Sequence, residues 1–253
     1  MTETPQSSLP PGLYITATPI GNASDITLRA LDVLRSCDAI VAEDTRVTSR
    51  LLAIHGISRP LLIYNDHNAP TVRPKLLQRL REGARLALVS DAGTPLVSDP
   101  GHKLVTAAQT EGIAVHPVPG PSAALAALTV SGLPSERFLF AGFLPAKSGE
   151  RRSALQELAP VPATLVVFES AQRLADTLHD MAEVLGARGA AVTRELQRVG
   201  YSPAAAGTAR QVAEVRVERF TFRPERGRGP VSVGVGGSTG SYGSGVGVGI
   251  GLD

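Results

Sequence analysis

The chain has 253 residues, 43% of them hydrophobic and 19% charged, with a formal net charge of +2 at pH 7. These totals predict an ordinary soluble globular protein of one or two domains, and the small charge is compatible with nucleic acid without demanding it. The single cysteine, Cys37, excludes an intramolecular disulfide and fits a reducing cytoplasm. No apolar run approaches the roughly 18 to 20 residues of a membrane span, and residues 1–11 are expected to form a disordered tail rather than a signal peptide.

The first half of the chain alternates short apolar runs with amphipathic segments. Asp25 is the expected cap of the first helix and Asp99 the expected N-cap of a helix over 102–110, and a third helix is expected over 73–82. Such repeated strand–helix units predict a doubly wound parallel sheet over residues 12–131. The strands are expected at 13–17, 39–42, 61–64, 86–89 and 113–118.

Small and polar residues follow three of these strands, at the edge where open parallel sheets bind ligands. Two of the bends are residues 18–22 and 119–122, and the third is Ser90-Asp91-Ala92-Gly93-Thr94-Pro95. In this third bend Gly93 lets the backbone approach a ligand closely, while Asp91 and Thr94 are the polar groups expected to face the cleft. The residues alone leave open the alternative that Asp91 and Asp99 only cap turns.

Two further polar clusters follow predicted strands. Glu43-Asp44-Thr45-Arg46 is the denser one, although Asp44 or Thr45 can equally be the cap of a solvated helix. His67 lies in an Asn- and Asp-rich segment, which favours a turn residue over a residue that takes part in chemistry.

A second α/β domain is expected over residues 135–196, after a boundary at 131–134. It contains predicted strands at 138–143, 164–168 and 190–193, a strand end at Glu169-Ser170, and a following helix whose apolar positions run from Leu174 to Leu185. After Gln197 the pattern is lost, and 11 of the 26 glycines lie between Gly227 and Gly251. Because such a stretch gains little by burial, residues 197–253 are predicted to be disordered.

Several familiar site patterns are absent from the sequence. It has no P-loop, no G-x-G-x-x-G after the first strand, no G-x-S-x-G elbow and no zinc-binding cluster. What remains is a crevice lined by backbone and small residues from three strand ends. Such a crevice suits a neutral or zwitterionic adenosine-bearing ligand that is held largely by main-chain hydrogen bonds.

Six segments together resemble the rRNA-methylating branch of the tetrapyrrole methylase superfamily: residues 13–22, 42–46, 90–101, 119–123, 131–134 and 142–145. The resemblance runs from about Leu13 to Glu195. It implies a fold of two α/β domains with S-adenosyl-L-methionine (SAM) in the cleft between them, in a homodimer. It also implies methylation of the ribose 2′-hydroxyl of a cytidine in the decoding region of 16S rRNA, with the small ribosomal subunit as partner, in the cytoplasm.

The resemblance also implies roles for particular residues. The cofactor-contacting motifs of the family match Pro19, the segment from Ser90 to Pro95, and Pro121-Ser122, with Glu169-Ser170 closing the cleft from the second domain. A ribose hydroxyl is a poor acid, so its attack on a methyl group calls for a base and careful alignment. The hypothesis is that Glu43, Asp44 and Arg46 position or activate the RNA ribose.

The sequence departs from the family pattern at three places. It has His67-Asn68-Ala69 where the family has His-Asn-Glu, and Glu169-Ser170-Ala171-Gln172-Arg173 where the family has Glu-Ser-Pro-His-Arg. After Leu196 the family ending is missing, which predicts a change of reading frame near Gln197 and an incomplete second domain. Two alternatives remain open: methylation of a tetrapyrrole or another small molecule, and an inactive protein that only binds SAM or rRNA.

Overall fold

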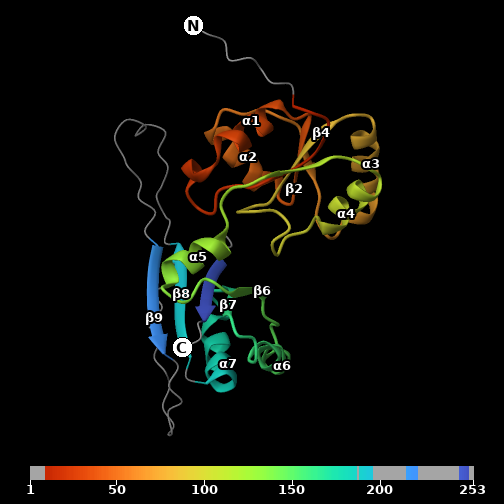
Figure 1. The fold of residues 1–253 in the computed structure, drawn as a ribbon. Coiled ribbons are helices and arrows are strands. Elements are labelled where there is room, and N and C mark those ends of the chain that lie inside the picture. The colour runs from red at the N-terminus through yellow and green to blue at the C-terminus, as the bar shows by residue number, and fades with distance from the viewer. Residues whose placement is uncertain (1–8, 187, 196–214, 222–244, 251–253) are drawn as a thin grey trace, which may run out of the picture. The chain divides into compact units, whose positions relative to one another are not determined.

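A computed structural model describes residues 9–186, 188–195, 215–221 and 245–250 (Figure 1). The chain divides into two compact units, Met1–Ser122 and Ala123–Asp253. No helix in these described parts of the chain is long and apolar enough to cross a membrane.

The first unit is built on a sheet of five strands that all run parallel, in the order β3-β2-β4-β1-β5. This arrangement confirms the predicted doubly wound sheet. The strands are β1 (Gly12–Thr16), β2 (Ala39–Ala42), β3 (Leu61–Ile63), β4 (Arg85–Val89) and β5 (Val115–Val118). The connecting helices are α1 (Leu28–Ser36), α2 (Thr45–Ile54), α3 (Ala69–Arg81) and α4 (His102–Thr110).

Helices cover both faces of this first sheet (Figure 1). On one face α1 and α2 pack against buried strand residues such as Tyr14 and Ile40. On the other face α3 and α4 pack against Leu13 and Val41. Since successive strand residues point to opposite faces, these nearly continuous apolar strands fill two cores at once.

Two of the predicted helix caps are wrong. Thr27, rather than Asp25, caps α1, because its side-chain oxygen accepts from the amide of Ala30 at 3.1 Å, whereas Asp25 ends a short 3-10 helix. Gly101, rather than Asp99, precedes α4, with φ +132. A Cβ at Gly101 would lie 2.7 Å from the side chain of Leu96, so a glycine starts this helix.

The second unit has a mixed five-stranded sheet in the order β6-β7-β10-β8-β9. Only β6 and β7 pair in parallel, and the other three pairings are antiparallel. The elements are α5 (Ala123–Ser131), β6 (Phe138–Phe143), α6 (Ser148–Leu158), β7 (Thr164–Ser170), α7 (Leu174–Leu185), β8 (Gly189–Glu195), β9 (Val215–Thr221) and β10 (Gly245–Ile250). Leu155 of α6 and Met181 of α7 pack on one face of this sheet, and α5 lies on the other.

The second unit differs from the sequence prediction in two respects. Residues 123–131 were expected in the first domain, but they form α5, whose Ala124 and Leu128 pack on Val166 of β7, so this helix belongs to the second unit. Strands β9 and β10 lie in the stretch predicted to be disordered. In β10 apolar residues alternate with glycine, which is the period of a strand. The rest of 197–253, with the predicted frame change near Gln197, lies outside the described residues.

Candidate active site at the strand ends

Three loops meet at the carboxyl ends of β1, β4 and β5. The amides of Thr18 and Gly93 donate to each other's carbonyl groups, with N···O distances of 2.9 and 3.1 Å. The Thr18 hydroxyl donates to the carbonyl of Ser90 at 3.1 Å, and the Thr94 hydroxyl donates to the carbonyl of Pro121 at 3.0 Å. The structure therefore brings together the three bends that the sequence singled out.

The Ser90 loop is held in a conformation that requires glycine at position 93. Gly93 has φ +85, and a Cβ there would lie 3.2 Å from a methyl carbon of Ile20. The hydroxyl of the buried Ser90 donates to the Gly93 carbonyl at 3.0 Å. Ala92, just before Gly93, stays exposed, so the loop offers a small side chain and backbone to a ligand.

The end of the same loop is strained. Leu96 and Ser98 both have positive φ, at 73° and 66°. Such conformations cost about 1–3 kcal/mol each and gather at functional sites. Asp99 follows them, and burial raises its pKa to about 6, with the charges of Glu43 and Asp91 acting in the same direction. The prediction of Asp99 as a helix cap missed this environment, because it depends on burial in the folded loop and on Glu43, which follows another strand.

Asp44 is the N-cap of α2, as in the alternative that the sequence left open. Its carboxylate accepts from the Arg46 amide at 2.8 Å and pairs with the Arg46 guanidinium at 2.6 Å. These bonds lower the pKa of Asp44 to about 2. The Asp44 amide donates to the Asp91 carboxylate at 3.2 Å, which joins the loop after β2 to the loop after β4.

Glu43 lies among other carboxylates. Partial burial raises its pKa, and the charges of Asp91, Asp66 and Asp44 add to the effect. Burial also raises the pKa of Asp91, although the Asp44 amide opposes the change. Asp66, which follows β3, was not among the predicted site residues, although its position at a strand end was a signal. The carboxyl edge of β2, β3 and β4 is therefore rich in negative charge.

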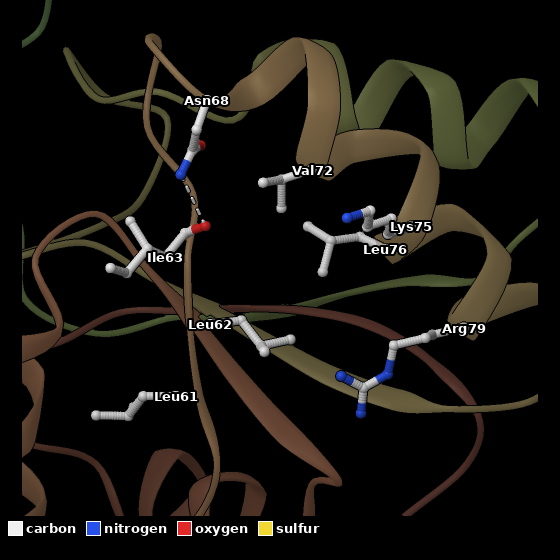
Figure 2. A pocket seen from close by; sticks show the side chains of 8 residues that line it. All are labelled: Leu61, Leu62, Ile63, Asn68, Val72, Lys75, Leu76 and Arg79. Atoms are coloured by element: carbon white, nitrogen blue, oxygen red, sulfur yellow. Dashed lines mark hydrogen bonds between the residues drawn. The ribbon is translucent and has the colours of Figure 1, made fainter.

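A cavity of about 570 Å³ lies elsewhere in the first unit, between β3 and α3 (Figure 2). In Figure 2 the Asn68 side chain donates to the Ile63 carbonyl, at 3.1 Å. The cavity holds none of the predicted site residues and is mostly apolar, so the candidate site remains at the strand ends. Its lining consists of Leu61, Leu62, Ile63, Asn68, Val72, Lys75, Leu76 and Arg79.

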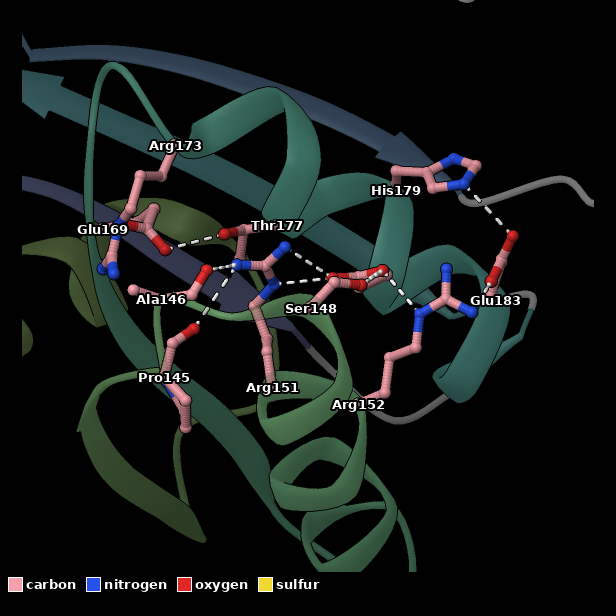
Figure 3. Close-up of polar contacts among 11 residues, drawn as sticks. Pro145, Ala146, Ser148, Arg151, Arg152, Glu169, Arg173, Thr177, His179 and Glu183 are labelled. Atoms are coloured by element: carbon pink, nitrogen blue, oxygen red, sulfur yellow. Dashed lines mark hydrogen bonds and ion pairs between the residues drawn. The ribbon is translucent and has the colours of Figure 1, made fainter.

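In the second unit the predicted contact residue Glu169 faces the protein interior. Its side chain is fully buried, and Figure 3 shows it between Arg173 and Thr177. The carboxylate accepts from the Ser170 amide, from Nε of Arg173 and from the Thr177 hydroxyl, each at 2.7 Å. Glu169 thus fixes the loop that follows β7, while Ser170 is half-buried at the start of that loop.

A second buried carboxylate, Asp180 of α7, holds the loop that follows β6 (Figure 3). Asp180 pairs with Arg151 and Arg152 at 2.6 and 2.7 Å, and it accepts from the Ser148 hydroxyl at 3.0 Å. Burial acts to raise the pKa of Asp180, but the hydrogen bonds from Arg152, Ser148 and Arg151 outweigh it and the pKa is lowered. Arg151 also donates to the Ala146 carbonyl at 3.0 Å. Sequence reasoning missed this network.

A model of the family Tetrapyrrole (Corrin/Porphyrin) Methylases matches residues 12–212. The chain therefore belongs to the tetrapyrrole methylase family. Among solved structures, the methyltransferase CobJ gives a TM-score of 0.61 at 17% identity, covering 95% of this chain and 94% of that one. A diphthine synthase gives 0.59 at 14% identity, covering 94% and 89%. At these identities the similarity concerns the fold alone, and it confirms the predicted fold class.

Within this family the chain groups with proteins named ribosomal RNA small subunit methyltransferase I. The protein of that name from Mesorhizobium japonicum is 54% identical over 214 residues, which are 84% of this chain and 72% of the relative. The one from Escherichia coli O157:H7 is 52% identical over 187 residues, 74% of this chain and 65% of the relative. These matches confirm the resemblance inferred from the motifs, and the family model extends it past Glu195.

SAM is the methyl donor of this family, which confirms the predicted cofactor. The residues at the strand ends of the first unit fit it. SAM carries a sulfonium and an ammonium cation and one carboxylate, so its net charge is positive, and the carboxylates of Asp91, Asp99 and Glu43 supply negative charge near one another. The exposed Ala92 and the glycine beside it let a flat adenosine approach the backbone.

Proposed function

We propose that this chain is a SAM-dependent methyltransferase that modifies the ribose 2′-hydroxyl of a cytidine in the decoding region of 16S rRNA. The identity of more than half to relatives named as small-subunit rRNA methyltransferases supports the reaction. The structural observation that carries it is the meeting of three bends at the ends of β1, β4 and β5, tied by the bridge between Thr18 and Gly93.

The donor-binding residues in this proposal are Pro19, Ser90 to Pro95, Pro121 and Ser122. When bound, SAM supplies an electrophilic methyl group on its sulfonium sulfur. The hydrogen bonds between Thr18 and Gly93 and between Thr94 and Pro121 already fix these loops in the free protein. Binding therefore orders little backbone, which favours affinity.

The ribose hydroxyl loses its proton as its oxygen becomes a nucleophile, and Glu43 is the proposed acceptor. Its raised pKa makes its carboxylate a stronger base than an ordinary glutamate. Asp44 is a weak base, with a pKa of about 2, so its proposed role is to position the loop. The side chain of Arg46 is 85% exposed, and we assign it to a phosphate of the RNA.

In the second unit Glu169 is the proposed positioning residue and Ser170 the proposed contact to the donor. Glu169 acts through its hydrogen bonds to Arg173 and Thr177, because its carboxylate is fully buried. The proposal also includes a homodimer and a cytoplasmic location, where ribosomal subunits are assembled and modified.

The direct test incubates the protein with SAM carrying a labelled methyl group and with small subunits that lack the modification. Label in a cytidine 2′-O-methyl group of 16S rRNA is the expected result. Label only in added tetrapyrroles, or no label despite SAM binding, would replace the proposal by one of its two alternatives. Glu43→Gln should lower kcat by at least about 100-fold, the usual contribution of a general base, and a wild-type rate would remove Glu43 as the acceptor.

A further inference from the structure

A β-bulge in β6 decides which face its phenylalanines share. Phe140 pairs with Val166 and Phe143 pairs with Phe168, so β6 has one more residue than β7 over this stretch. In a regular strand, residues three apart point to opposite faces. The extra residue rotates the end of β6, and Phe143 therefore points to the same face as Phe140 and Phe168.

The three rings form an ordered aromatic row on that face. The ring centroids of Phe140 and Phe168 lie 4.8 Å apart, and those of Phe143 and Phe168 lie 5.7 Å apart, both in edge-to-face contact. Helix α5 covers Phe140 and Phe168 through Ala124 and Leu128. Phe143, at the carboxyl end of the strand, remains 51% exposed.

The exposed ring of Phe143 is held by its surroundings. Leu144, the next residue, is buried in the core on the opposite face. The loop that follows is fixed by Arg151, which donates to the Ala146 carbonyl and pairs with Asp180 (Figure 3). The ring of Phe143 thus presents a flat apolar surface at the strand end. Because the ring is already held in place, a base that stacks on it does not have to order it first.

We propose that Phe143 stacks on a nucleobase of the RNA substrate, an inference that rests on the proposed function. Proteins bind single-stranded segments of RNA by stacking their unpaired bases on aromatic side chains. Aromatic residues make up only 4% of this chain, and among those whose exposure the structure describes, all within residues 9–186, only Phe138 and Phe143 are exposed. A phenyl ring has no hydrogen-bonding groups, so Phe143 holds a base without reading its identity.

Phe138 provides a matched control. It lies on the same strand and the same face as Phe143, and it is 42% exposed, but it stands at the amino end of β6. The experiment compares Phe143→Ala, Phe143→Leu, Phe143→Tyr and Phe138→Ala in two assays. One assay measures kcat and KM for unmodified small subunits at saturating SAM. The other measures retention of labelled subunits on filters without SAM.

Phe143→Ala should raise both KM and the dissociation constant for subunits about tenfold, the loss expected for one stacked base. The kcat should change much less, since stacking holds substrate and transition state alike. Phe143→Tyr keeps the ring and should stay within about threefold of wild type, whereas Phe143→Leu keeps apolar bulk and should resemble the alanine variant. Phe138→Ala should match wild type.

Equal effects of Phe143→Ala and Phe138→Ala would overturn the inference, and so would rescue by leucine as complete as rescue by tyrosine. A change confined to SAM affinity or to self-association would overturn it as well. If Phe143→Ala fails to fold, the leucine and tyrosine variants still decide, because both keep the packing volume. Failure of the proposed function is distinguishable, since the wild type would then transfer no label to rRNA, whereas failure of this inference alone leaves wild-type transfer intact.

Discussion

Both units carry acidic residues that contact the loops after their strands, but the surroundings of these residues differ between the units. In the first unit, burial and mutual repulsion raise the pKa values of Glu43, Asp91 and Asp99. In the second unit, Asp180 is paired with two arginines, and Glu169 accepts hydrogen bonds from three residues. Raised pKa values gather where a protein binds or transforms a ligand.

The contrast has an energetic meaning. A buried carboxylate is costly unless it is paired and hydrogen-bonded. In the second unit, arginines and hydrogen-bond donors of the same unit compensate the buried carboxylates, and these contacts hold the neighbouring loops in place. In the first unit Glu43 and Asp91 are exposed and Asp99 is half-buried, so the repulsion among these carboxylates is only partly compensated, and a cationic ligand such as a sulfonium compound would reduce it. This difference supports the proposal of a donor site in the first unit, with a supporting role for the paired carboxylates of the second.

The largest expected effect on stability comes from removing the buried carboxylate of Asp180 in the second unit. Asp180→Ala leaves the buried Arg151 without its counter-charge, so the free energy of unfolding should fall by about 3–5 kcal/mol. The control is Glu157→Ala, which removes an exposed carboxylate from α6 and should change stability by less than about 0.5 kcal/mol. Denaturant unfolding measures both variants. A loss from Asp180→Ala no larger than that from the control would contradict the assignment of a structural role.

A second variant tests the close backbone approach in the first unit. Gly93 and Gly83 have nearly equal φ values, +85 and +87, but only a Cβ at Gly93 meets a neighbour within 4 Å. Both alanine variants should lose about 1–2 kcal/mol of stability from backbone strain. Gly93→Ala should in addition weaken SAM binding about tenfold in calorimetry, equivalent to about 1.4 kcal/mol. Equal SAM affinities of the two variants would place the donor away from this loop.

A third variant, Asp99→Asn, tests the raised pKa of Asp99 through the pH dependence of stability. Asp99 has a pKa of about 6 in the folded protein, above its value in the unfolded chain. Its protonated form therefore favours the folded state, and that contribution is lost as the pH rises through 6. Asp99→Asn stays neutral, so it should be more stable than wild type by about 1–2 kcal/mol at pH 7, since partial solvent contact reduces the full effect.

The advantage of Asp99→Asn should disappear as the pH falls to about 4, where both proteins carry a neutral group. Urea unfolding at the two pH values measures it. The exposed Asp32 gives a control, because Asp32→Asn should change stability little at either pH. A constant difference between Asp99→Asn and wild type across this range would show that the charge of Asp99 is not the cause.

Local patterns predicted many elements correctly. The bounds expected for residues 39–42, 102–110 and 138–143 are those of β2, α4 and β6, and the apolar positions that predicted a helix after Glu169-Ser170 lie in α7. Apolar periodicity is a local property, so it can be read without the fold. Helix α3 begins four residues earlier than expected; Pro70 lies in its first turn, where proline is tolerated, whereas Pro74 lies inside the helix.

The candidate site was predicted in part. The positions of Ser90, Gly93 and Pro121 at strand ends follow from the alternation of strands and helices, and the structure brings them together. The environment of Asp99 could not be predicted, because Glu43 approaches it from the loop after β2, and the burial of Asp99 depends on how its own loop folds back. The partners of Asp180 could not be predicted from the sequence either, since its ion pairs join two helices that are separated in the chain by a whole strand.

The smallest effect on stability, and the finest test of the first unit as the site of RNA contact, concerns Arg46. Its ion pair with Asp44 is exposed, so Arg46→Ala should leave the unfolding temperature unchanged. If Arg46 contacts a phosphate, the slope of log binding constant against log salt for small subunits should fall by about one. Arg81→Ala removes a comparable exposed pair, with Glu111, from the far end of α3 and should leave the slope unchanged. Equal slopes for both variants would show that the RNA does not contact the loop after β2 through Arg46.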